Sequence, residues 1–176
     1  MPHTIRTERL VLSPACRRDG TALSRAVNHW DVLRHTGTWP FPSDADATTR
    51  RLAQAERYDA RRDAVFVIRH GGDVAGTVGL HRQRGRTFEI GYMLGPAFWG
   101  RGLATEAARA VCAHGFRALG ADAITACAYV DNPASGRVLL KLGFAALPGT
   151  RPGWSAARES SAPMRDYRLA REGWSL

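Results

Sequence analysis

The fold is decided by the stretch Phe88-Glu89-Ile90-Gly91-Tyr92-Met93-Leu94-Gly95-Pro96-Ala97-Phe98-Trp99-Gly100-Arg101-Gly102-Leu103-Ala104-Thr105-Glu106-Ala107. Its first residues alternate between apolar and polar or small side chains, which is the period of a pleated strand. From residue 103 to residue 119, apolar side chains recur at the spacing of a helix. The stretch therefore predicts a strand over residues 88–92, a glycine-containing loop and a helix over residues 102–119.

Two glycines, Gly100 and Gly102, flank Arg101 at the predicted start of this helix. Glycine lets the backbone approach a ligand closely. The unpaired N–H groups of the first turn and the positive end of the helix dipole favour an anion, so the expected ligand is a phosphate. A P-loop would need a lysine after its last glycine, but the only lysine is Lys141. A dinucleotide fingerprint would need a third glycine where Thr105 stands.

The length of 176 residues suits a single domain over residues 1–176. No apolar run has the length of a signal peptide or a membrane span, so we expect a cytoplasmic protein with no membrane partner. The three cysteines, Cys16, Cys112 and Cys127, form an odd set without C-x-x-C spacing. They predict neither a disulfide framework nor a metal site.

The formal net charge of +9 raises the possibility of a nucleic-acid-binding module. However, the arginines are scattered, and no predicted helix has a continuous basic stripe with interleaved aromatic residues. We therefore expect no nucleic-acid partner and keep this class as an alternative. The excess positive charge would attract a polyanionic cofactor.

Around the central stretch, the patterns predict an α/β fold. Short turns join the first strands, so that part of the sheet should be antiparallel, and the strand after the long helix should be parallel to the strand before it. The remaining expected elements are strands over residues 8–14, 64–69, 74–80, 123–128 and 164–170, helices over residues 19–27 and 43–61, a hairpin turn over residues 70–73 and a loop over residues 148–163. Ser43 is the expected N-cap of the second helix.

Residues 29–42 form a proline-rich loop that contains Trp39 and Phe41. Such a loop could hold a small substrate. Alternatively, these aromatic side chains cover the core beneath a helix. Further along, Asn132 precedes Pro133 and predicts a helix N-cap, while Gly143 predicts the end of that helix.

Two motifs carry a resemblance to a known family. The run Trp99-Gly100-Arg101-Gly102-Leu103-Ala104 resembles the signature with which the GNAT superfamily of N-acetyltransferases holds the pyrophosphate of coenzyme A, although Trp99 replaces the usual Gln or Arg. With Thr105-Glu106-Ala107, it is similar to the RimJ/RimL branch, which acetylates ribosomal-protein N-termini. The stretch from Asn132 to Phe144 resembles a second family motif, and the likeness covers about residues 5–174.

The resemblance implies a GNAT fold, with a single mixed, mostly antiparallel sheet that is splayed at the cofactor site and flanked by helices. It implies acetyl-CoA as the cofactor. The backbone N–H groups of Met93 and Leu94, at a bulge in the central strand, would face the thioester carbonyl. The other cofactor-binding residues that it implies are Trp99, Gly100, Arg101, Gly102, Leu103, Ala104, Thr105 and Asn132.

The same resemblance suggests the proton-transfer groups. Glu89 stands on the central strand just before the cofactor loop, where a carboxylate could take the proton of an amine directly or through a water. Leu139 occupies the place of a tyrosine that acts as the acid in many members of the superfamily. Ser135 is then the candidate donor to the departing sulfur, with Tyr129 or a water as alternatives. The region of Trp39 and Phe41 lines the acceptor side in the resembling family.

We therefore expect an acetyl-CoA-dependent N-acetyltransferase that acetylates a primary amine, on a protein N-terminus or a small molecule, by direct attack in a ternary complex. No nucleophilic cysteine or serine elbow indicates a covalent intermediate. Besides the nucleic-acid-binding module, the alternative is an acyl-CoA-binding sensor without turnover. A homodimer is common in the branch and is possible here.

Overall fold

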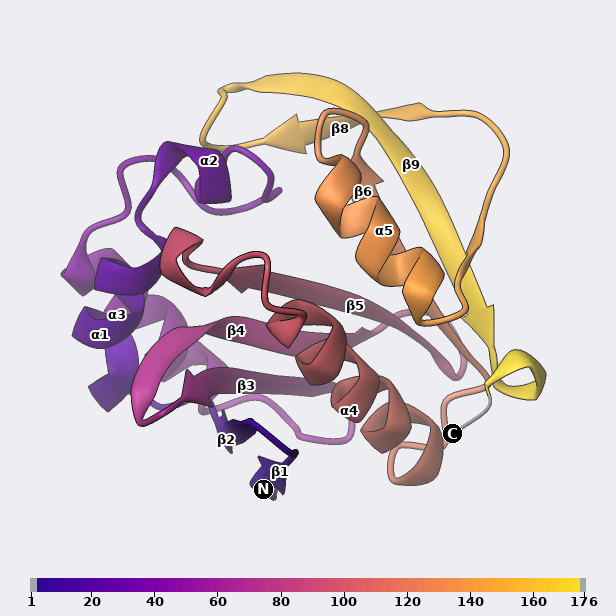
Figure 1. The fold of residues 1–176 in the computed structure, drawn as a ribbon, viewed down its shortest axis with the longest axis horizontal. Coiled ribbons are helices and arrows are strands. Elements are labelled where there is room, and N and C mark those ends of the chain that lie inside the picture. The colour runs from indigo at the N-terminus through magenta and orange to yellow at the C-terminus, as the bar shows by residue number, and fades with distance from the viewer. Residues whose placement is uncertain (1–2, 175–176) are drawn as a thin grey trace.

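The structure of the protein is a computed structural model that describes residues 3–174. Nine strands form one sheet in the order β1-β2-β3-β4-β5-β6-β9-β7, and β8 pairs with β9 (Figure 1). The strands are β1 Ile5–Arg6, β2 Leu10–Pro14, β3 Asp63–His70, β4 Asp73–Arg82, β5 Thr87–Leu94, β6 Ala123–Tyr129, β7 Ala145–Ala146, β8 Arg151–Ser155 and β9 Ser160–Ala170. The α-helices are α1 Gly20–Val27, α2 Trp30–Leu33, α3 Ala45–Ala55, α4 Leu103–Arg117 and α5 Pro133–Lys141.

The sheet is mixed, as the sequence predicts. Strands β2 to β5 pair antiparallel, and β5 pairs parallel with β6 after the crossover through α4. The hairpin turn between β3 and β4 is also confirmed, since Gly71 and Gly72 both have positive φ. A two-residue loop with positive φ at both positions matches the twist of antiparallel strands.

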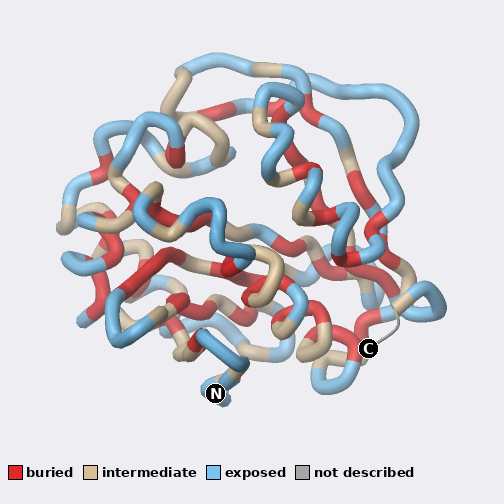
Figure 2. The backbone as a smooth tube through the Cα atoms, in the orientation of Figure 1, coloured by how far each residue is buried: buried red, intermediate tan, exposed pale blue. Residues whose placement is uncertain are grey.

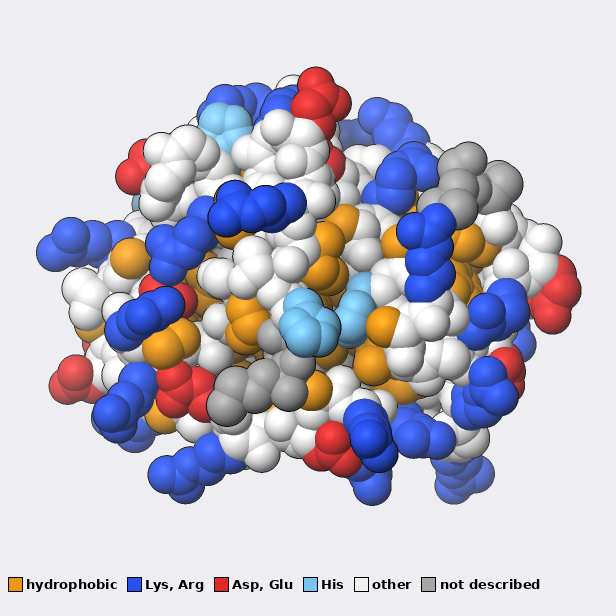
Figure 3. Space-filling model, turned by 90° about the horizontal axis from the view of Figure 1, so that it is seen from below, with side chains coloured by type: hydrophobic (Ala, Val, Ile, Leu, Met, Phe, Trp, Pro, Cys, Tyr) orange, Lys and Arg blue, Asp and Glu red, His pale blue; other side chains and the backbone are white. Residues whose placement is uncertain are grey.

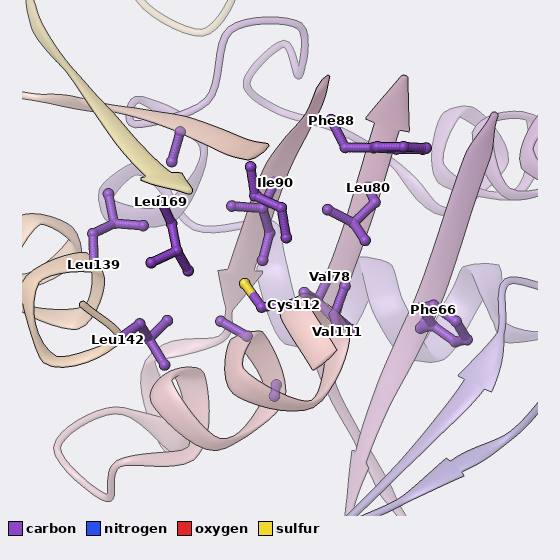
Figure 4. Packing of buried hydrophobic residues seen from close by; sticks show 14 of the residues in the cluster. Phe66, Val78, Leu80, Phe88, Ile90, Val111, Cys112, Leu139, Leu142 and Leu169 are labelled. Carbon is purple, nitrogen blue, oxygen red and sulfur yellow. The ribbon is translucent and has the colours of Figure 1, made fainter. Parts of the chain in front are cut away.

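Helices cover the two faces of the sheet differently. Helices α4 and α5 lie in front of the sheet in Figure 1 and pack on one face, where the larger core cluster forms. Figure 4 shows Val111 and Cys112 of α4 and Leu139 of α5 pointing toward Leu80, Ile90 and Leu169 of the strands. A second cluster on the opposite face contains Leu23, Leu33 and Leu52 from α1, α2 and α3. Buried segments run along the central strands between these two layers (Figure 2).

The helix expected over residues 43–61 is shorter, and its cap differs. Asp44 caps α3, because its side chain accepts a hydrogen bond of 2.7 Å from the Ala47 N–H. Ser43 is buried, and its backbone N–H donates instead to Asn28 Oδ1 at 2.8 Å. The helix ends at Ala55. Asp59 then accepts from the Arg61 N–H at 3.0 Å, a local turn that competes with further helix.

The expected loop over residues 148–163 is mostly a hairpin, so this prediction is wrong. Strand β8 pairs with the first half of β9, from Arg151↔Met164 to Ser155↔Ser160. Gly153 permits close packing, because a Cβ there would lie 1.7 Å from Met164 Sδ. The glycine, proline and serine residues of this segment have low intrinsic strand propensity, so tertiary pairing rather than local pattern produces the hairpin.

The bulge expected near Met93 and Leu94 is not found in the pairing of β5. The β4–β5 register is regular from Gly76↔Leu94 to Arg82↔Phe88. The irregularity lies in the β3–β4 pair between Ile68 and Arg69, where β4 contains one extra residue. The bulge therefore belongs to the strand beside the predicted one.

Candidate active site

The two central strands separate to form a cleft. Strands β5 and β6 pair only at Thr87↔Ala123, Phe88↔Ile124 and Glu89↔Thr125. Beyond Glu89, no pairing between these strands is recorded within residues 3–174, and a cleft of about 1140 Å³ is lined by both of them. The predicted splaying of the sheet is thus confirmed, and Glu89 lies at the point where the strands diverge.

The glycine loop forms one wall of the cleft. Gly100 and Gly102 have φ values of +72° and +73°, the left-handed region that glycine enters without steric cost. Helix α4 begins directly after Gly102, so the N–H groups of its first turn have no partner within the helix and face the loop end. Trp99, Gly100, Gly102 and the three residues that follow line the cleft. Unpaired N–H groups at a helix start favour an anion as the neighbour.

Arg101 is placed differently from its neighbours in the loop. Its side chain is outside the cleft lining and donates to His70 Nε2 at 3.1 Å. Its carbonyl accepts from Arg9 Nη1 at 2.9 Å. Arg9 also forms a salt bridge of 2.7 Å with Glu106 in the first turn of α4. These contacts tie the loop to the start of β2.

Glu106 is held as a carboxylate by this arrangement. Burial alone would raise the pKa of Glu106, but hydrogen bonds from Thr7 and Arg9 outweigh burial and lower it. Thr7 Oγ1 donates to Oε1 at 2.6 Å, and the Arg9 backbone N–H donates to the same oxygen at 2.9 Å. The sequence motif contained Glu106 but gave no signal of its partners, which are 97 and 99 positions away.

The opposite wall comes from the second motif. Asn132 caps α5, and its Oδ1 accepts from the Ser135 N–H at 3.3 Å, as the sequence predicts. Gly143, just beyond the helix end, has φ of +89°, which confirms it as the terminating glycine. Both Asn132 and Ser135 line the cleft. A helix cap and a place in the cleft therefore coexist at Asn132.

Tyr92 joins the two motifs, and sequence reasoning missed it. The Tyr92 hydroxyl lies 3.0 Å from Ser135 Oγ and donates to the Ser135 carbonyl at 3.1 Å. Burial raises the pKa of Tyr92 to about 12, so the phenol stays protonated at neutral pH. In the sequence, Tyr92 reads only as an apolar strand residue, because its partner comes from another element.

The other two positions considered for the acid are differently engaged. Leu139 is fully buried in the core and does not line the cleft. Tyr129 lines the cleft, and its hydroxyl donates to the Trp154 carbonyl. Burial raises the pKa of Tyr129. Ser135 also lines the cleft, and the side-chain contact of its hydroxyl is with Tyr92.

Glu89 is contacted by two neighbours at the base of the cleft. Gln83 Nε2 donates to Oε2 at 3.2 Å, and the Cys127 thiol donates to Oε1 at 3.7 Å. Burial, together with the Glu89 charge, raises the pKa of Cys127 to about 11. The thiol is therefore protonated at neutral pH, which makes it a poor nucleophile. All three cysteines are free in the structure.

The segment over residues 29–42, here called the aromatic loop, contributes only one of its two candidate substrate-binding residues to the cleft. Trp39 lines the cleft, and the Arg51 guanidinium lies over its ring at 4.7 Å. Phe41 is 40% exposed, lies outside the cleft lining and packs edge-on against Trp30 at 5.7 Å between ring centroids. The structure therefore places Phe41 away from the cleft, against Trp30 on the outer surface.

The β8–β9 hairpin lines the end of the cleft that lies beside Trp39. The Ala156 N–H donates to the Gly37 carbonyl at 3.0 Å, and Ser155 Oγ donates to the Arg34 carbonyl at 3.1 Å. Arg158 donates to Asp131 at 3.0 Å and so ties the hairpin to the end of β6. The hairpin and the aromatic loop therefore form one continuous wall.

Charge is spread over the surface. Figure 3 shows basic side chains distributed across the face seen from below, interrupted by acidic and uncharged ones. Several arginines pair with carboxylates, including Arg69 with Asp19 and Arg151 with Asp166. Within residues 3–174, no helix is long and apolar enough to cross a membrane, and no group of three His, Cys, Asp or Glu side chains is arranged to hold a metal.

Comparisons with known proteins agree with this geometry. Residues 9–145 match the family model described as an acetyltransferase (GNAT) domain. The uncharacterized N-acetyltransferase YoaA of Bacillus subtilis (strain 168) is 34% identical over 144 residues, which cover 80% of this chain and 81% of YoaA. RimL, a ribosomal α-N-protein acetyltransferase solved with coenzyme A, superimposes with a TM-score of 0.83 at 19% identity, covering 96% and 98% of the two chains. RimJ of Mycobacterium smegmatis gives a TM-score of 0.82 at 22% identity over 97% and 88%.

Proposed function

The chain belongs to the acetyltransferase (GNAT) family and is an N-acetyltransferase, and from this premise we propose that it transfers the acetyl group of acetyl-CoA to a primary amine by direct attack in a ternary complex. One observation carries the proposal. The cleft between β5 and β6 brings an anion-binding helix start, a hydroxyl donor and a carboxylate to one place.

The residues of the glycine loop fit the pyrophosphate of coenzyme A. A Cβ built on Gly100 would meet no atom within 4 Å, so the loop faces open space. The first-turn N–H groups of α4 would donate to the phosphate oxygens. Asn132 on the opposite wall would contact the pantetheine arm. When bound, acetyl-CoA supplies an acetyl group activated as a thioester.

The side chains of the cleft then have separate proton roles. Glu89, where the strands diverge, accepts a proton from the acceptor nitrogen directly or through a water. Ser135 donates a hydrogen bond to the departing sulfur, and Tyr92 orients the Ser135 hydroxyl. The N–H groups of Met93 and Leu94 would stabilise negative charge on the carbonyl oxygen. The protonated thiol of Cys127 supports direct transfer over a covalent intermediate.

The acceptor enters from the side of Trp39 and the β8–β9 hairpin. Residues from β3, α2, α3 and β8 line this part of the cleft, which would receive a peptide N-terminus or a small amine. The names of RimL and YoaA support an amine acceptor in general. We propose a primary amine without bulky substituents.

Thermal melting with candidate ligands tests the proposal. A ligand at about 100 times its dissociation constant stabilises by about 2.7 kcal/mol, which corresponds to a rise in Tm of roughly 5 to 11 °C for a chain of this size. We expect acetyl-CoA and coenzyme A, but neither NAD nor ATP, to raise Tm. Thiol release with a panel of primary amines then measures turnover. Binding without turnover of any amine would support the sensor class, and no response to acetyl-CoA would refute the proposal.

A further inference from the structure

Three polar side chains form a row across neighbouring strands at the base of the cleft. Asp63 of β3 is paired with His81 of β4, and His81 is paired with Glu89 of β5. The neighbouring residues Ala64, Leu80 and Phe88 are buried in the core on the α4 face, so the row occupies the opposite face, toward the acceptor side. His81 and Glu89 both line the cleft.

Asp63 fixes the orientation of the His81 ring. His81 Nδ1 lies 2.8 Å from Asp63 Oδ1, a hydrogen bond in which Nδ1 is the donor because the carboxylate can only accept. In the neutral ring, Nε2 is then the free acceptor. A Cβ built on Gly79 would lie 3.4 Å from His81 Nε2, so this nitrogen is directed over Gly79.

Two glycines form a bare floor beside this nitrogen. Gly79 of β4 is paired with Gly91 of β5, and both line the cleft. A Cβ on Gly91 would meet nothing within 4 Å. A Cβ on Gly79, by contrast, would lie 3.3 Å from Val65 Cγ2. The floor therefore has room for a slender group over Gly91, beside the His81–Glu89 pair.

The chemistry of an amine explains why two acceptors would be useful. An α-amine has a pKa of about 7.7 to 8.0 and an alkyl amine one of about 10.4, so both reach the enzyme largely as ammonium ions at neutral pH. The nitrogen must lose one proton before it can attack and a second when the amide has formed. Glu89 alone provides one carboxylate.

We propose that His81, held by Asp63, is a catalytic residue that takes the first proton from the acceptor ammonium, and that the floor of Gly79 and Gly91 selects an unhindered primary amine. This inference rests on the proposed function. One N–H bond of the ammonium breaks, and the proton joins His81 Nε2. As the C–N bond forms and the C–S bond breaks, the second proton leaves to Glu89. One proton returns to the thiolate, and the other passes to solvent, so the protons balance.

The charges around His81 are compatible with this role. Asp63 and Glu89 flank it in the row and would stabilise the imidazolium that forms. Beyond Glu89 lie the Cys127 thiol and the Arg151 guanidinium, and Arg151 is paired with Asp166 through two hydrogen bonds of 2.8 and 2.9 Å. An ammonium ion in the cleft would thus approach the Glu89 carboxylate, while Asp63 stays bonded to the far side of the His81 ring.

The pH dependence of His81→Gln separates a catalytic role from a structural one. The probes are a tripeptide with a free α-amine and the ε-amine of an N-acetyl-lysine amide, assayed by thiol release. With the tripeptide, we expect kcat/KM to fall about 100-fold at pH 6.5. The loss should shrink to a few-fold at pH 9, where the α-amine arrives deprotonated, but should persist with the ε-amine. A loss that is equal at every pH and for both amines would overturn the proposal.

Two further variants accompany His81→Gln. His29→Gln replaces an exposed histidine outside the cleft lining and should leave both pH profiles unchanged. If His81→Gln fails to fold, Asp63→Asn tests the same role, because an amide no longer enforces Nδ1 as the donor.

Nitrogen NMR of the His81 ring in the unmodified protein gives a readout that needs no turnover. We expect a protonated Nδ1 and a bare Nε2 in the neutral ring, whereas protonation at Nε2 would overturn the inference. If no probe amine is acetylated, the proposed function fails for these amines, and the tautomer still decides the assignment of His81.

Discussion

Replacing Gly91 by alanine should strongly lower activity while leaving the fold intact. The residue lies on β5 just beyond the last pair with β6 and has no positive φ, so alanine fits its backbone without strain. Its new methyl group would meet nothing within 4 Å of the protein and would project onto the floor of the cleft. Only the acceptor amine would be displaced.

The expected effects of Gly91→Ala on stability and on activity have opposite signs. A strain-free Gly→Ala substitution stabilises by about 0.4 to 1 kcal/mol because it restricts the unfolded chain, which corresponds to a rise in Tm of roughly 1 to 4 °C. A reacting atom displaced by about 1 Å loses about 100-fold in rate. We therefore expect kcat/KM for the amine to fall about 100-fold in a protein that is slightly more stable.

The assay combines Tm, the Kd of acetyl-CoA by calorimetry, and kcat/KM for an accepted amine. Gly173→Ala is the matched control, since a Cβ there also meets nothing within 4 Å but the residue lies outside the cleft lining. Gly76→Ala provides the contrast, because its Cβ would lie 2.0 Å from the Met93 carbonyl oxygen and should destabilise the fold. Full activity in Gly91→Ala would refute the placement of the amine on this floor.

Four further predictions concern the cofactor loop, the proposed base and two partly buried titratable groups. Glu89→Gln should lower kcat by about 10²- to 10⁴-fold and leave the Kd of acetyl-CoA unchanged; unaltered kcat would remove Glu89 from the proton path. Gly102→Val forces a branched residue into the left-handed region, at a cost of about 1 to 2 kcal/mol, and calorimetry should show acetyl-CoA binding weakened by at least tenfold. The pKa of Glu106 is lowered in the folded protein, so its contribution to stability is present above the ordinary value of 4.5 and is lost as pH falls through the folded value. The free energy of unfolding in urea should therefore differ less between pH 6 and pH 3 in Glu106→Gln than in the unmodified protein. Burial lowers the pKa of His114 below 6.5, so its contribution to stability is fully present above pH 6.5 and is lost as pH falls through the folded value. The free energy of unfolding should therefore decline less steeply with falling pH in His114→Gln, and an unchanged decline would contradict the lowered pKa.

Much of the cofactor side could be predicted from the sequence, since it is built from local patterns. The left-handed glycines before α4 and the Asn132 cap followed by proline each lie within a few residues of the backbone they shape. The parallel pairing of β5 with β6 also followed from local information, because a helical crossover leaves few alternatives. By contrast, Ser43 and Asp44 are both good capping residues, and only the contact of Ser43 with Asn28 decided between them.

The proposed acceptor side depends on tertiary structure. The sequence places Asp63, His81 and Glu89 up to 26 positions apart, and only the register of three strands brings them into one row. The hairpin of β8 and β9 likewise depends on cross-strand pairing of residues with weak strand propensity. The Tyr92 hydroxyl finds Ser135 43 positions later, because α5 packs beside the splayed strands. Short-range preferences of the backbone determined the loop that would hold the cofactor, whereas long-range strand register determined the groups that would meet the amine.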